Sequence, residues 1–204
     1  MTEFQAFFKL GFEHILNLEG ISAFFTGIDH ILFIVVLSAV YQMREWRKIL
    51  ILVTAFTIGH SLTLILAGLN VIGFNPKLIE ILIPITIFVT AIWNLIEKPS
   101  EISHSEAALR LRYFFAVAFG LIHGFAFSNS PRSIFALSRD EIVLKLFAFN
   151  LGIEVGQIIV VLIVLMIAFL INQDSRKKQL YWNTTLSSLV LIASTWLFYQ
   201  KLME

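Results

Sequence analysis

Long apolar stretches, separated by short charged connections, constrain this chain more than any other feature of its sequence. A transmembrane helix needs about 20 mainly apolar residues. Stretches of that length lie at about 21–41, 49–69, 78–96, 111–129, 144–171 and 180–200. Only 14% of the 204 residues are charged, against roughly 25% in a typical soluble domain. So few charges could not cover so much apolar surface in water, and the sequence therefore predicts the lipid bilayer as its solvent.

The predicted fold class is all-α, a polytopic membrane helix bundle of about six transmembrane helices. No Gly/Ser linker divides the sequence, so residues 1–204 are expected to form a single integral membrane domain. Residues 2–18 are too few and too charged to span, and their spaced Phe and Leu residues predict an interfacial amphipathic helix. A re-entrant piece that dips into the protein is the alternative for this segment.

Lys and Arg in the short connections indicate the orientation of the chain. If the N-terminus lies outside, nine of the 15 basic residues fall on the cytoplasmic side. These are Arg44, Arg47, Lys48, Lys98, Arg110, Arg112, Arg176, Lys177 and Lys178. The bias favours an outside N-terminus. A net charge of +1 argues against nucleic acid as a partner, and the absence of Cys excludes disulfides and thiolate metal sites.

Ionisable side chains inside the apolar stretches are the candidate functional residues, because an unpaired charge in hydrocarbon costs several kcal/mol. They are Asp29, His30, His60, Glu80, His123 and Glu154. At a rise of about 1.5 Å per residue, all but Glu80 lie about 9–15 Å from the outer ends of their helices. The candidates therefore share one layer of the membrane, with Glu80 near its rim. His104, in the charged segment 98–112, is expected to be a solvated surface residue instead.

Neutral imidazole nitrogens and carboxylate oxygens, without sulfur, suit first-row divalent ions such as nickel, cobalt, zinc or iron. A catalytic zinc site needs three protein ligands and an open position for water, whereas a transport site needs exchangeable coordination. A buried polar network that only joins helices is the third interpretation. Uncharged polar residues at helical spacing accompany the candidates: Thr57 and Ser61 near His60, and Asn150 and Gln157 near Glu154.

Five phrases of the sequence together resemble the HupE/UreJ family of bacterial membrane proteins. They are Gly11-x-x-His14-Ile15, Gly27-x-Asp29-His30-Ile31-Leu32-Phe33, Phe56-Thr57-x-x-His60-Ser61-x-Thr63-Leu64, Phe119-Gly120-Leu121-x-His123-Gly124-Phe125-x-Phe127 and Phe149-Asn150-x-Gly152-x-Glu154-x-Gly156-Gln157. The resemblance runs from about residue 4 to the last apolar stretch. Where relatives usually carry Ala and Ser in the third stretch, this chain has Pro84 and Thr86, which keeps a hydroxyl in place.

The resemblance implies a nickel or cobalt permease of the bacterial inner membrane, with the lipid bilayer and the metal ion as its partners. It implies metal ligation by His14, Asp29, His30, His60, Glu80, His123 and Glu154, with Asn150, Gln157 and Thr57 as partners that orient the ligands. A zinc-dependent intramembrane hydrolase, with Asp29 and Ser61 as its catalytic residues, is the alternative. A non-enzymatic assembly subunit with a structural polar core is the other, and a homo-oligomer is left open.

Overall fold

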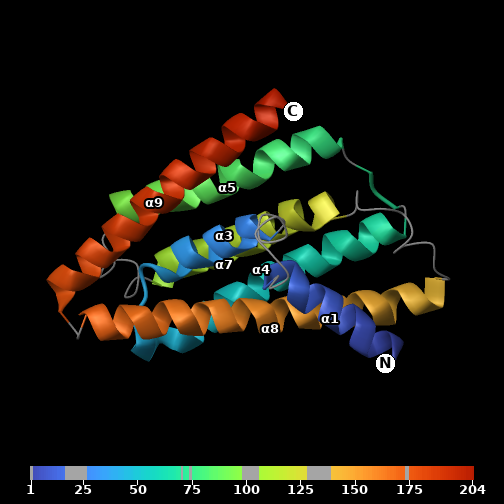
Figure 1. Cartoon of the computed structure of the whole chain (residues 1–204), viewed down its shortest axis with the longest axis horizontal. Helices are drawn as coiled ribbons and strands as arrows, with labels where there is room; N and C mark the ends of the chain where they lie inside the picture. Colours follow the sequence, from blue (N-terminus) through green and yellow to red (C-terminus); the bar gives the residue numbers. More distant parts are fainter. Residues whose placement is uncertain are drawn as a thin grey trace.

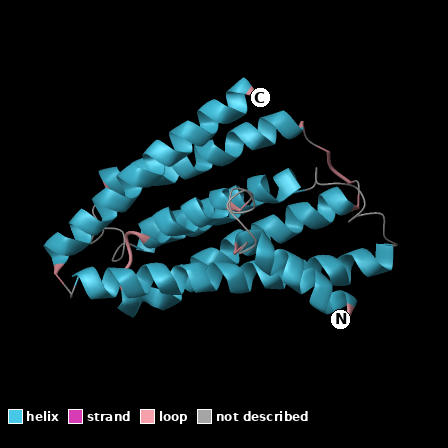
Figure 2. Cartoon of the chain, in the orientation of Figure 1, coloured by secondary structure: helices cyan, strands magenta, loops and turns pink. Residues whose placement is uncertain are grey.

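Helices form all the regular structure of the part of the chain that the computed structural model describes, which confirms the predicted all-α class (Figure 2). The described residues are 2–16, 27–69, 71–73, 75–97, 106–127, 139–172 and 175–204. Their helices are α1 (Glu3–Ile15), α3 (Ile28–Ser38), the short 3-10 helix η1 (Met43–Glu45), α4 (Trp46–Gly68), α5 (Pro76–Ile96), α7 (Glu106–Phe127), α8 (Arg139–Asn172) and α9 (Arg176–Met203). His104 lies outside the described residues.

Four segments are long and apolar enough to cross a membrane: Met43–Ala67, Pro76–Ile96, Glu106–Ala126 and Val143–Ile171. They coincide with the second to fifth apolar stretches of the sequence. The first stretch is described only from residue 27, where α3 forms an apolar helix of 11 residues. These segments define a helical membrane bundle.

The sixth stretch forms α9, a helix of 28 residues that turns its polar side inward. Its buried residues include Gln179, Asn183 and Ser187, whereas Ile192 and Trp196 are 68% and 60% exposed. Polar side chains of this kind hydrogen-bond to neighbouring helices, and the apolar side chains face lipid. The overall hydropathy of α9 is low because its buried side is polar.

Local signals in the sequence define where two of the helices begin. Thr2 and Gln5 form a capping box at the start of α1, in which the Thr2 hydroxyl accepts from the Gln5 N–H and the Gln5 side chain accepts from the Thr2 N–H. Asn75 caps α5 by accepting from the Lys77 N–H at 3.0 Å, and Pro76 occupies the first helical position.

Helix α1 enters the bundle from the side of the N-terminus and packs across α8 (Figure 1). A Cβ on Gly11 would collide with the Phe149 carbonyl, and one on Gly152 with the Phe8 carbonyl, so the two backbones are in contact. The start of α1 is exposed, as expected for an interfacial helix, but Ile15 in its last turn is 1% exposed. The last turn of α1 is therefore buried among the other helices.

The last turn of α1 meets the first turn of α3 near the middle of the molecule. A Cβ on Gly27 would collide with the His14 carbonyl, so the end of one helix abuts the beginning of the other. Figure 1 shows α1 reaching the centre from one side and α3 continuing from there toward the other. The ends of two short helices, here called half-helices, thus meet inside the bundle.

Candidate metal centre

Four histidines from four different helices meet at the junction of α1 and α3. The ring of His30 lies at the centre of this histidine cluster, with ring-centroid distances of 5.0 Å to His14, 5.1 Å to His123 and 5.7 Å to His60. All three pairs pack edge to face. His30, His60 and His123 are 6%, 0% and 1% exposed. The structure therefore brings together the four histidines that the sequence and the resemblance singled out.

Close packing of α4 on α7 brings His60 and His123 to the same level. Gly120 precedes His123 by three residues and Gly124 follows it directly, and Cβ atoms on them would collide with the carbonyls of Phe56 and His60. Only glycine lets the α4 backbone approach α7 so closely. The small residues around His123 are thus the reason that the two imidazoles can share one site.

A hydrogen bond to Asn150 determines which nitrogen of His60 carries its proton. The Asn150 Nδ2 donates to the Leu146 carbonyl at 2.8 Å, which leaves Oδ1 as the atom that faces His60. Because Oδ1 can only accept, His60 Nδ1, at 3.2 Å, must donate. The lone pair of His60 then sits on Nε2, a buried atom without a hydrogen-bond partner among the described residues.

Thr86 fixes the tautomer of His123 in the same way. Its hydroxyl donates to the Ile83 carbonyl at 2.7 Å, so its oxygen accepts from His123 Nε2 at 3.3 Å. The lone pair of His123 is therefore on Nδ1, which is buried and finds no hydrogen-bond partner in the described part of the chain. Second partners of this kind are what orients imidazole ligands at metal sites.

Aromatic rings enclose the cluster. Phe56 lies 5.1 Å from His123 and 5.8 Å from His30 between ring centroids, and Phe33 lies 5.8 Å from His123. Both nitrogens of His30 lack hydrogen-bond partners among the described residues. A buried polar atom without a hydrogen bond destabilises the folded state, and a bound ligand is one explanation for its presence.

No three His, Asp or Glu side chains of the described residues are grouped so that they could hold one metal ion in this conformation. The imidazole rings instead pack edge to face around His30. Ligation of one ion by several of these imidazoles would require the rings to turn about their side-chain bonds. The cluster has the donor atoms of a metal site, but in this conformation these atoms do not converge on one metal position.

The predicted carboxylates have other partners. Glu80 forms an ion pair with Lys201 at 3.6 Å, and Glu154 accepts a hydrogen bond from Thr54 at 2.8 Å. Asp29, in the first turn of α3 beside His30, also interacts electrostatically with Lys201. Asp29 and Glu80 therefore both interact with Lys201, in the last turn of α9, whereas Glu154 bonds to α4.

The uncharged polar candidates divide into two groups. Asn150 hydrogen-bonds to His60. Thr57 and Gln157 instead hydrogen-bond to each other at 2.9 Å. The Ser61 hydroxyl donates to the Thr57 carbonyl at 2.7 Å. The bond between Thr57 and Gln157 joins α4 to α8 beside the cluster.

Two buried polar residues were not predicted from the sequence as part of a polar network, Thr86 at the histidine cluster and Arg112 away from it. Thr86 was noted only as a departure from relatives, yet it bonds to His123. Arg112 was counted with the charges of a cytoplasmic connection, which is wrong because it lies within α7 and is 3% exposed. The available signal was the four-residue spacing of Thr86, Thr90 and Asn94, which places a polar stripe on one face of α5.

Four of the helices are long and apolar enough to cross a membrane, and imidazoles from several helices are buried at the junction of α1 and α3. These features define a polytopic membrane protein with a histidine site among its helices. The family model described as HupE / UreJ protein matches residues 1–200. The chain therefore belongs to the HupE/UreJ family. No curated protein and no solved structure matches it.

Proposed function

We propose that this protein is a permease that carries a divalent transition-metal ion, of the nickel or cobalt type, across the bacterial inner membrane. The proposal rests on the position of His30, whose ring is surrounded by three other imidazoles inside the bundle. Neutral imidazole without thiolate suits these borderline ions. Membership of the HupE/UreJ family is consistent with a role in metal transport or metal supply.

The geometry of the two half-helices favours a cation at the cluster. The last carbonyls of α1 have no partners within their own helix, and the C-terminal end of a helix carries partial negative charge. His14 belongs to this last turn. In many transporters such broken helices place their ends at the ion site, near the middle of the membrane. The junction of α1 and α3 would thus stabilise the ion together with the imidazoles.

The cluster would work as a relay and not as a closed cage. The ion would reach it from the side on which α1 begins, which the basic residues of the sequence assign to the outside. Asp29 and Glu80 lie at that end with Lys201 between their charges. Edge-to-face imidazoles that bind the ion a few at a time would let it move on, as transport requires.

Uptake of nickel, cobalt and zinc by liposomes that contain the purified protein tests this function. We expect His30→Ala and His123→Ala to reduce uptake at least about tenfold, the usual minimum effect of losing a metal-site residue. His104→Ala is the matched control, because the sequence places this histidine in a charged segment. Uptake by the His30 and His123 variants at the rate of the His104 variant would contradict the proposal.

A further inference from the structure

A line of polar side chains on α5 leads away from the histidine cluster toward the other end of the bundle. Thr86 contacts His123, and the Thr90 hydroxyl donates to the Thr86 carbonyl at 2.9 Å. Asn94, one turn further on, accepts from Arg112 at 2.9 Å. These side chains are spaced by four residues and are all buried, so they form one continuous inner face of α5. The line ends at a positive charge.

A small cavity lies between the cluster and that charge. Its volume is about 10 Å³, and its lining includes Phe33, Thr90, Phe119 and Arg112. Phe33 also contacts His123, so it separates the cavity from the cluster. About one water molecule fits into a space of this size. The Arg112 Nε has no hydrogen-bond partner among the described residues, so a water here would give it one.

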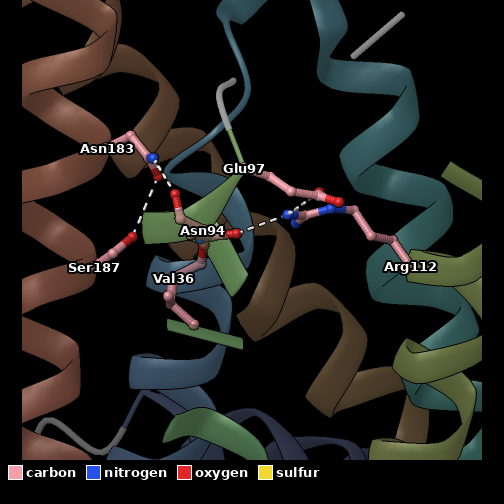
Figure 3. A network of polar contacts seen from close by, with 6 residues as sticks. All are labelled: Val36, Asn94, Glu97, Arg112, Asn183 and Ser187. Carbon is pink, nitrogen blue, oxygen red and sulfur yellow. Dashed lines mark hydrogen bonds and ion pairs between the residues drawn. The ribbon is translucent and has the colours of Figure 1, made fainter. Parts of the chain in front are cut away.

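Arg112 donates a hydrogen bond to Asn94 and forms a longer ion pair with Glu97 (Figure 3). The Asn94 Nδ2 donates to the Val36 carbonyl at 2.6 Å, which turns its Oδ1 toward the guanidinium. The Glu97 carboxylate is 3.9 Å away, beyond hydrogen-bond distance. The Trp93 ring packs on the guanidinium at 5.0 Å from its centroid. A neutral amide at hydrogen-bond distance and a carboxylate at ion-pair distance thus orient the guanidinium of Arg112.

Asn94 also joins the helices around this charge. Its backbone carbonyl accepts from Asn183 of α9 at 2.7 Å, and the Asn183 side chain in turn accepts from Ser187 at 3.2 Å. Together with the bond to Val36, these contacts tie α3, α5, α7 and α9 at one level (Figure 3). The network therefore fixes the position of the guanidinium relative to the path.

We propose that Arg112 is a charge barrier that keeps cations, protons included, from running freely between the histidine cluster and the inner end of the bundle. The direction of the path rests on the proposed function, but the barrier does not depend on which ion is carried. A fixed positive charge in a poorly screened interior repels any cation near it, and channels use buried Arg residues in this way. For a metal ion to pass, the guanidinium would swing from Asn94 toward Glu97.

Proton leak through liposomes that contain the purified protein tests the barrier without any metal. We expect Arg112→Gln to raise the proton leak at least about tenfold, because losing a repulsion of about RT ln 10 lowers the barrier by that amount. Arg112→Lys keeps the charge and should stay tight. Arg110→Gln is the matched control, because Arg110 lies on the same helix with its side chain 81% exposed. A leak in Arg112→Gln no greater than in Arg110→Gln would overturn the proposal.

Charge-dependent labelling supplies a second readout that does not rely on the Gln variant. The chain has no cysteine, so Thr90→Cys is a single reporter beside the cavity. A small anionic thiol reagent should label it at least about ten times faster than a cationic one, with the ratio kept in Arg112→Lys and reduced in Asn94→Ala. Equal rates for both reagents would refute the barrier. If the proton leaks of the parent and the Arg112 variants are as expected but the parent takes up no metal, the permease function is refuted and the charge barrier is not.

Discussion

Hydrogen bonds to two buried imidazoles act at the scale of single residues, because each leaves one defined nitrogen with a lone pair. The Asn150 Oδ1 accepts a hydrogen bond from His60 Nδ1, and the Thr86 hydroxyl oxygen accepts one from His123 Nε2. An imidazole can bind a metal only through its unprotonated nitrogen. The two partners therefore determine which side of each ring can face an ion, without touching the ion themselves.

Isosteric removal of these partners should weaken metal binding. In Thr86→Val the hydroxyl is lost at nearly constant volume, so His123 can adopt either tautomer. We expect the affinity of the purified protein for nickel to fall about 10–100-fold, the usual effect of losing such a partner. Isothermal titration calorimetry measures it. Thr86→Ser, which keeps the acceptor, is the control, and equal affinities for the Val and Ser variants would contradict this account.

The sequence could predict the histidines but not all of their contacts. His30, His60 and His123 stand out because imidazoles interrupt long apolar stretches, and helical rise places them in one layer. Helical rise gives no information about which neighbour a side chain faces. For this reason the partners of the two carboxylates were not predicted: Glu80 pairs with Lys201, and Glu154 bonds to Thr54.

The broken first span is the main feature at the scale of elements. The last turn of α1, a helix of 13 residues, meets the first turn of α3, a helix of 11, and this brings His14 and His30 together. The spaced Phe and Leu residues of segment 2–18 pointed to an amphipathic helix but did not reveal that its last turn enters the bundle. Contact between the α1 and α8 backbones, at Gly11 and Gly152, is what holds it there.

A methyl group at the contact of α1 with α8 should separate these helices. In Gly11→Ala the new Cβ would collide with the backbone carbonyl of Phe149, which cannot move aside as a side chain could. We expect a loss of about 1–3 kcal/mol in stability, seen as a lower unfolding temperature in detergent. Gly73→Ala is the control, because no atom lies within 4 Å of its Cβ position. The same unfolding temperature in both variants would argue against this contact.

At the scale of the whole molecule, two polar levels are spaced along an apolar bundle. One is the histidine cluster at the half-helix junction, and the other is the network of Asn94, Arg112 and Asn183. The six long apolar stretches predicted a helical membrane bundle, and four of them coincide with segments long and apolar enough to cross a membrane. They could not reveal the second level, because Arg112 and Asn183 lie near the ends of apolar stretches, where charged and polar residues are common.

The central claim is that a transported metal ion binds to imidazoles around His30. X-ray absorption spectroscopy of the nickel-loaded purified protein tests it most directly, because imidazole rings give a characteristic scattering pattern. We predict histidine nitrogens at about 2.0–2.1 Å from the metal, the range for imidazole bound to a first-row ion such as zinc. The signal should weaken in His30→Ala and persist in His104→Ala. Bound nickel with only oxygen neighbours, or with a histidine signal that His30→Ala leaves unchanged, would contradict the claim.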